Sequence, residues 1–124
     1  NIGYGTNLSD KEITEKIESM GLSPFIKSLS NGFNTLAGKE GNNLSGGQRQ
    51  FVSLIRSILQ NKTIILMDEP TSSLDQINKK LFIRLIKNLK NVHLIITSHD
   101  TQLTDIFDTV IRIDKGQVVN IVEK

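Results

Sequence analysis

Two adjacent acidic residues, Asp68 and Glu69, follow four consecutive apolar residues in the segment TIILMDEP. So short an apolar run predicts a strand buried on both faces, and open α/β sheets collect their ligands at the carboxyl ends of such strands. Neighbouring strand residues point in different directions, so the two carboxylates can have different roles. One could hold Mg2+, usually through its waters, while the other accepts a proton from an attacking water or orients it. The alternative is that both acids only cap the next turn.

A second group of candidates is the segment LSGGQ, residues 44–48, at the predicted start of a long amphipathic helix. Its glycines permit another group to approach the backbone closely, and a helix start offers unpaired N–H groups and the positive end of the helix dipole. Ser45 could add its hydroxyl and Gln48 its amide, so the segment suits an anion. A serine cap after a flexible loop explains the same residues equally well.

A histidine, His99, follows the second predicted strand in the segment TSHD. A histidine in such a place is more often a hydrogen-bonded structural residue than a catalytic one. Here, however, a glycine-rich helix start, an acidic pair and a histidine all fall on loops at the ends of predicted core elements. Together the three features predict a phosphate site.

These candidates depend on a predicted α/β fold with parallel strands and flanking helices. A strand beginning at Ile64, a helix over 76–90 and a strand over 92–97 form a crossover unit, and its right-handed connection makes the two strands parallel. The helix over 76–90 is predicted to lie at the surface, with one apolar face. That face comprises Ile77, Leu81, Phe82, Leu85, Ile86 and Leu89, and the remaining positions carry Lys79, Lys80, Arg84 and Lys87.

Further elements are predicted on both sides of this crossover unit. Ser9 and Glu12 form a capping box before a helix over 10–20, and an apolar face from Phe51 to Leu59 predicts a helix over 45–60. Short helical segments are predicted from Ser23 and near 101–107, with a loop over 31–43. The segments TVIRI and QVVNIV, joined by DKG, predict a C-terminal β-hairpin.

Composition narrows the possible functions. A length of 124 residues and a hydrophobic content of 37% fit one globular unit. Fifteen Lys and Arg residues against 13 Asp and Glu give a net charge of only +2, so no dense basic patch predicts a nucleic-acid partner. The absence of cysteine excludes disulfides and thiolate zinc sites, and no apolar run approaches the roughly 18 residues that a membrane span requires.

The candidate segments resemble four motifs of the nucleotide-binding domain of ATP-binding cassette (ABC) transporters, in the family's order and spacing. Residues 64–68 look like its Walker B strand, Glu69 like its catalytic glutamate, and His99 like its switch histidine. The signature motif corresponds to Leu44, Ser45, Gly46, Gly47 and Gln48, and the D-loop to Ser72, Ser73, Leu74 and Asp75.

This resemblance implies an ATPase that uses ATP and Mg2+, with Asp68 helping to hold the ion through water. It also implies two kinds of partner: a second nucleotide-binding domain, paired head to tail, and the transmembrane domain of a transporter. Ser45, Gly46 and Gly47 would contact the γ-phosphate of ATP bound mainly by the partner domain. The expected place is the cytoplasmic face of a membrane, where ATP-driven closure of the dimer powers export.

The resemblance also identifies what the sequence lacks. No GxxxxGK[ST] phosphate loop occurs, so the chain is expected to be the C-terminal portion of a P-loop NTPase-type domain and inactive by itself. Residues 1–60 would complete the helical subdomain that carries the signature motif, and residues 61–124 would be the C-terminal part of the ATPase core. The segments NIGYG and GLSPFIKSLSNGFNT are similar to exporter-type members, although residues 38–41, GKEG, depart from the exporters' usual Gly-Glu-Arg-Gly.

Two alternatives remain open at the level of sequence. One is a non-transport relative that uses the same ATP sandwich as a clamp on nucleic acid or ribosomes, and the other is a non-catalytic interaction module. The clamp would favour a coiled-coil insertion or a basic arm, neither of which occurs here, and the interaction module would predict damaged motifs. The transported substrate is not specified, because its selectivity would reside in membrane segments.

Overall fold

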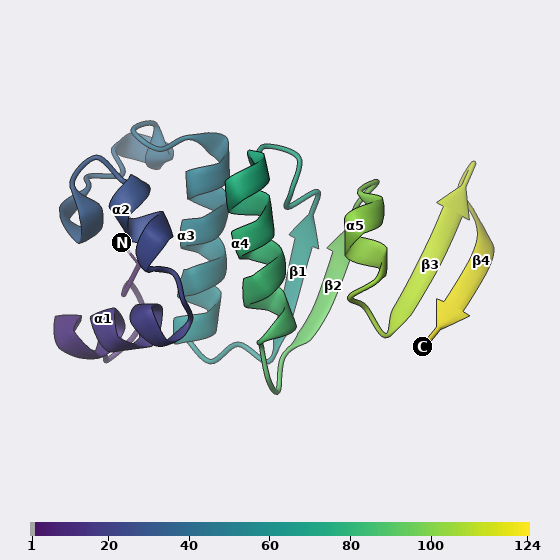
Figure 1. Ribbon diagram of the computed structural model, residues 1–124, viewed down its shortest axis with the longest axis horizontal. Coiled ribbons are helices and arrows are strands. Elements are labelled where there is room, and N and C mark those ends of the chain that lie inside the picture. The colour runs from purple at the N-terminus through teal and green to yellow at the C-terminus, as the bar shows by residue number, and fades with distance from the viewer. Residues whose placement is uncertain (1) are drawn as a thin grey trace.

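The molecule extends from helices at its N-terminal end to a hairpin of strands at its C-terminal end (Figure 1). The computed structural model describes residues 2–124. The helical elements are α1 (Asp10–Ser19), α2 (Ser23–Ser28), η1 (Gly32–Asn34), η2 (Lys39–Gly41), α3 (Gly46–Leu59), α4 (Gln76–Lys87) and α5 (Thr101–Thr104). The strands are β1 (Ile64–Asp68), β2 (His93–Thr97), β3 (Thr109–Asp114) and β4 (Gln117–Glu123). The first residue of the predicted 1–60 unit, Asn1, lies outside the described residues.

Strands β1 and β2 pair in parallel and are connected through α4, which confirms the predicted crossover unit. The register sets Ile64 opposite His93 at one end and Asp68 opposite Thr97 at the other. Both strands therefore end at the same edge of the sheet. Figure 1 shows that the start of α3 and the start of α4 lie toward this same end of the molecule.

Strands β3 and β4 form the predicted antiparallel hairpin as a separate sheet. Lys115 and Gly116 make the connecting turn with φ angles of 48° and 77°. Positive φ at both turn residues is typical of the type I′ turn, which suits the twist of a two-residue hairpin. The hairpin extends away from the helices at the C-terminal end of the molecule (Figure 1).

Side-chain caps mark where α1, α3 and α4 begin. Ser9 and Glu12 form the predicted capping box at α1, and Ser45 forms the same arrangement at α3. Asp75 caps α4 by accepting a hydrogen bond from the backbone N–H of Asn78, at 2.8 Å. The cap at α4 matters for the site, because it fixes where the loop after β1 must end.

The apolar core lies among the helices and continues onto one face of the β1–β2 sheet. Phe51 of α3 is its centre: its ring stacks on Phe25 of α2 at 4.8 Å between centroids and meets the edge of Phe82 of α4 at 6.2 Å. Both halves of the chain contribute to this cluster. The division into a 1–60 and a 61–124 unit remains a prediction.

Strand β1 is not buried on both faces, as its apolar run predicted. Ile65 is 6% exposed and belongs to the core, whereas its neighbour Leu66 is 72% exposed. Successive strand residues point to opposite faces, so only one face of β1 is covered within the part of the chain described here. Strand β2 shows the same alternation.

The predicted apolar face of α4 is also only partly correct. Phe82, Leu85 and Ile86 are buried, but Ile77 is 79% exposed. Ile77 precedes Ile86 by nine residues, which is about two and a half turns, so the two side chains lie on opposite sides of the helix. The helix also ends at Lys87 rather than at residue 90, and α5 ends at Thr104 rather than at residue 107.

No helix among residues 2–124 combines the length and the apolar character needed to cross a lipid bilayer.

Candidate functional site

The loop after β1 turns sharply at Glu69. Its backbone N–H still donates to the carbonyl of Thr97 at 3.0 Å, so the strand pairing continues one residue beyond Asp68. Glu69 itself has a φ of 46°, in the left-handed region that non-glycine residues rarely adopt, and a buried proline follows it. Such conformations persist where the surroundings impose them, and they concentrate at functional sites.

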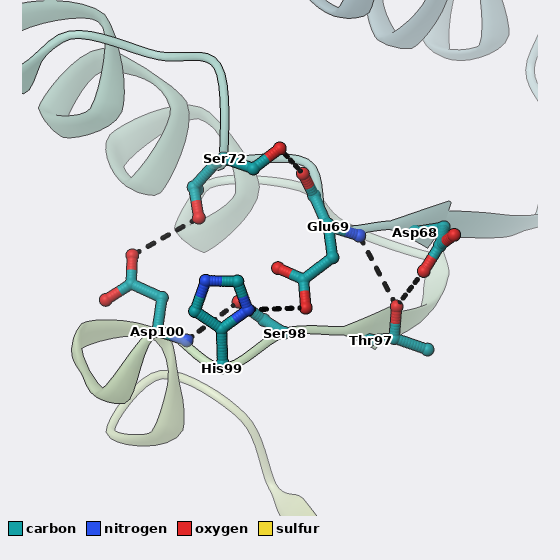
Figure 2. Close-up of polar contacts among 8 residues, drawn as sticks. Asp68, Glu69, Ser72, Thr97, Ser98, His99 and Asp100 are labelled. Carbon is teal, nitrogen blue, oxygen red and sulfur yellow. Dashed lines mark hydrogen bonds and ion pairs between the residues drawn. The ribbon is translucent and has the colours of Figure 1, made fainter.

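Glu69 and His99 meet across the carboxyl ends of the two strands. The Nδ1 atom of His99 lies 2.8 Å from Oε1 of Glu69, and Figure 2 shows the two side chains pointing toward one another. The side chain of His99 is 82% exposed, and that of Glu69 is 36% exposed. The structure thus brings the predicted histidine to the predicted glutamate, 30 residues away in the sequence. Their catalytic roles remain predictions.

Asp68 is held by a residue that sequence reasoning did not select. The hydroxyl of Thr97 donates to Oδ1 of Asp68, and the backbone N–H of Glu69 approaches the same hydroxyl oxygen at 3.3 Å (Figure 2). Thr97 stands opposite Asp68 in the strand register. A threonine two residues before the histidine, at the end of a predicted parallel strand, was the available signal.

A second polar cluster lies beside the Glu69–His99 pair and was also missed. Asp100 accepts hydrogen bonds from Lys79 Nζ at 2.5 Å and from Thr71 Oγ1 at 3.2 Å. The hydrogen bond from Lys79 is the main reason that the pKa of Asp100 lies below its ordinary value; burial acts in the opposite direction. Lys79 was predicted among the surface residues of its helix, but its side chain is only 16% exposed because Asp100 receives it.

Two side chains of the same segment cap the start of α3. Ser45 Oγ accepts from the backbone N–H of Gln48 at 3.2 Å, and the Gln48 side-chain oxygen accepts from the backbone N–H of Ser45 at 2.9 Å. Leu44 is buried in the core. Ser45 and Gln48 therefore form the serine cap that the sequence left open as an alternative to an anion site. The first N–H groups of a helix still lack partners within the helix, so a serine cap and an anion site are compatible.

The glycines of this helix start permit a close approach, as predicted, but the approaching group belongs to this chain. A Cβ atom on Gly47 would lie 2.7 Å from Leu74 Cδ2 and 3.0 Å from the carbonyl oxygen of Ser73. Ser73 also donates its hydroxyl hydrogen to the side-chain oxygen of Gln50 in α3, at 3.1 Å. The proposed D-loop therefore packs directly on the proposed signature helix.

The proposed D-loop also contacts Glu69. The backbone N–H and the hydroxyl of Ser72 both donate to the carbonyl of Glu69, at 3.1 and 2.9 Å. Within residues 2–124, no hydrogen bond or ion pair joins Ser45 or Gln48 to Asp68, Glu69 or His99. The predicted site residues form two groups, one at the strand ends and one at the start of α3, and the proposed D-loop contacts both.

The described residues contain no group of three or more His, Cys, Asp or Glu side chains that could hold a metal ion. Mg2+ usually keeps several waters and is held by one or two carboxylates together with phosphate oxygens. Asp68 has one carboxylate oxygen engaged by Thr97 and a second one free of that bond. A single carboxylate fits an ion that a nucleotide would help to hold.

The fold and the site define an α/β domain of the kind that handles ligands at the carboxyl ends of parallel strands. The family model described as ABC transporter matches residues 5–72, more than half of the chain. The chain therefore belongs to the ABC transporter family, as a portion of an ATP-binding domain of the exporter type.

Individual relatives agree with this assignment. The chain is 37% identical over 121 residues to a Rickettsia typhi protein named as an export ATP-binding/permease protein, covering 96% of this chain and 21% of that protein. It is 32% identical over 122 residues to an ATP-dependent lipid A-core flippase of Francisella tularensis, covering 96% and 20%. A bacterial Atm1-family ABC exporter with ATP bound superimposes with a TM-score of 0.78 at 27% identity, covering 98% of this chain and 22% of that one. The chain spans about a fifth of the length of these relatives.

Proposed function

We propose that this chain supplies the Walker B, D-loop and signature portion of an ATP-hydrolysing exporter subunit, in which closure of two nucleotide-binding domains drives export. Glu69 orients and polarises the attacking water, His99 contacts the γ-phosphate, and Asp68 helps hold Mg2+ through water. The signature residues Ser45, Gly46 and Gly47 face ATP bound to a partner domain.

The observation that carries this proposal is the 2.8 Å contact between Glu69 Oε1 and His99 Nδ1. A carboxylate can only accept a hydrogen bond, so the Nδ1 atom that it contacts carries the proton. The opposite ring nitrogen, Nε2, is then an acceptor in neutral imidazole and a donor in imidazolium. In the protonated form, His99 can donate to a phosphate oxygen while it keeps the glutamate in place.

One further observation supports transport. The names of the matched relatives refer to export or to lipid A-core flipping, which favours an exporter over a clamp on nucleic acid. The predicted partners are a second nucleotide-binding domain and a transmembrane domain, at the cytoplasmic face of a membrane. These partners belong to the proposal, because the chain matches only about a fifth of each relative.

The test is a chimera in which this chain replaces the matching segment of the Rickettsia typhi relative. We expect the purified chimera to hydrolyse ATP, and Glu69→Gln to reduce the rate by about 100-fold or more, because general-base assistance contributes that much. ATP binding should be retained and the ATP-bound dimer trapped. Glu123→Gln, on the exposed strand β4, is the matched control and should leave the rate unchanged. Hydrolysis by Glu69→Gln at the rate of the unmodified chimera would refute the role given to Glu69.

A further inference from the structure

The contact between Glu69 and His99 needs support that the two side chains do not provide themselves. Both residues lie on loops, and the His99 side chain is 82% exposed. Exposed ion pairs and hydrogen bonds contribute little, because water and salt compete for both partners. The two loops must therefore be held at a fixed separation by contacts that are better protected from solvent.

Better protected contacts lie in the same two loops and in α4. We propose that Lys79, Asp100 and Thr71, here called the Asp100 network, are positioning residues that hold His99 against Glu69. This inference rests on the proposed function, since it assigns these residues to the same site. Asp100 follows His99 immediately, and Thr71 lies two residues after Glu69.

The Asp100 network joins three separate segments of the chain. Asp100 comes from the loop after β2, Thr71 from the loop after β1, and Lys79 from α4. Lys79 and Asp100 have side chains only 16% and 13% exposed, and Thr71 is the buried polar residue among residues 2–124. Their hydrogen bonds are therefore protected, and they fix the loop that carries the histidine to the loop that carries the glutamate.

The two oxygens of the Asp100 carboxylate have different partners, so two roles can be separated. Oδ1 accepts from the backbone N–H of Gln102 at 3.0 Å and caps the short helix α5. Oδ2 accepts from Thr71 and from Lys79. A change at Thr71 removes the bond between the two loops, and a change at Lys79 removes the bond from α4 to the loop that carries His99. Neither change removes the bond from Gln102 to Oδ1 that caps α5. These two positions therefore test the positioning role without disturbing the cap.

The state of the Glu69–His99 contact can be read directly in the 124-residue chain. The sequence contains two histidines, so ring signals of His99 and His93 are readily told apart after histidine-specific 15N labelling. His93 begins strand β2 at the opposite end from the site and serves as an internal reference. Glu69→Ala defines the ring-nitrogen shifts of His99 when the contact is absent. The measurement requires no ATP, so it stands or falls separately from ATP hydrolysis.

The decisive variant is Lys79→Met at constant pH, which keeps the length of the side chain and removes its charge and donor. We expect the His99 ring-nitrogen signals to move to the positions seen in Glu69→Ala, while the His93 signals stay unchanged. Lys79→Arg should restore the wild-type positions. Lys80→Met, at the exposed neighbouring position, removes the same charge and should have no effect.

Wild-type His99 signals in a folded Lys79→Met chain would overturn the proposal. If Lys79→Met loses the dispersed amide spectrum of a folded chain, Thr71→Val decides instead, because valine keeps the shape of threonine and removes only its hydroxyl. A folded Thr71→Val chain with wild-type His99 signals would likewise overturn the proposal, whereas a shift toward the Glu69→Ala positions would support it.

Discussion

Gly47 lies directly against Leu74, with room for a hydrogen atom but not for a methyl group. A Cβ at position 47 would approach Leu74 Cδ2 to 2.7 Å and the backbone oxygen of Ser73 to 3.0 Å. The oxygen belongs to the main chain and cannot simply rotate away. The start of α3 and the loop after Glu69 are thereby fitted to one another, so a displacement of either segment must be accommodated by the other.

Gly47→Ala should destabilise the chain by about 1–3 kcal/mol, the usual range for adding a methyl group to a filled site. Urea-induced unfolding measures this directly. Gly46→Ala is the matched control: its Cβ would lie 3.3 Å from Cβ and Oγ of Ser73, so a shift of only a few tenths of an ångström would accommodate it. Alanine also favours helix over glycine by up to about 1 kcal/mol, so this variant should remain within about 1 kcal/mol of the wild type. Equal effects at both positions would contradict the packing argument.

Acid should destabilise the fold partly through Asp100. Its pKa in the folded chain is lowered, chiefly by the hydrogen bond from Lys79. A carboxyl group with a lowered folded pKa stabilises the fold above about pH 4 and loses that contribution as the pH falls through the folded pKa. Between about pH 5 and pH 2, the free energy of unfolding should therefore decline more steeply in the wild type than in Asp100→Asn. Identical slopes would show that the charge of Asp100 does not stabilise the fold. Glu12, whose pKa is also lowered by its bonds to Ser9, acts equally in both proteins.

The 124-residue chain should bind ATP weakly or not at all. Its sequence contains no GxxxxGK[ST] loop to hold the phosphates, and Ser45 and Gln48 are engaged in capping α3. A titration of fluorescent ATP with Mg2+ should give no saturation below millimolar concentrations. The same titration into the chimera provides the positive control. Micromolar binding by the chain itself would mean that these residues form a complete pocket, and the assignment of Ser45, Gly46 and Gly47 to a partner's ATP would be wrong.

The exposed face of the β1–β2 sheet should cause self-association. Leu66 and Ile95 are neighbours in the strand register, and both are more than half exposed. Uncovered apolar surface and unpaired strand edges favour pairing between copies. Sedimentation velocity should show species larger than a monomer as the concentration rises, and Leu66→Lys with Ile95→Lys should reduce them. Ile77→Lys, on the exposed side of α4, should not. A chain that stays monomeric at high concentration would refute the expectation.

The local features of the fold could be predicted from the sequence because their causes are local. Ser9 and Glu12 lie three residues apart, and their capping box marks the start of α1 in sequence and structure alike. The parallel pairing of β1 with β2 followed from the order strand, helix, strand. The meeting of Glu69 with His99 then required only that parallel strands end at the same edge.

The contacts between distant segments could not be predicted in the same way. Lys79 has the spacing of a surface residue, and its partner Asp100 appears 21 positions later with nothing in the pattern to connect them. The sequence indicated only that a group approaches the backbone at Gly47, and it did not show that this group is Leu74. The burial of β1 on one face reflects what packs against the strand, which an apolar run alone does not specify.

The register of β1 against β2 has a consequence for how the site can vary. Asp68 faces Thr97, and Glu69 forms the next backbone hydrogen bond along the same ladder. A strand can slip against its neighbour only in whole residues, and a slip of one residue turns every side chain to the other face of the sheet. The offset between Glu69 and His99 along the two strands can therefore change only in steps of whole residues. Variants of this chain either keep the alignment or lose it, with no intermediate spacing available.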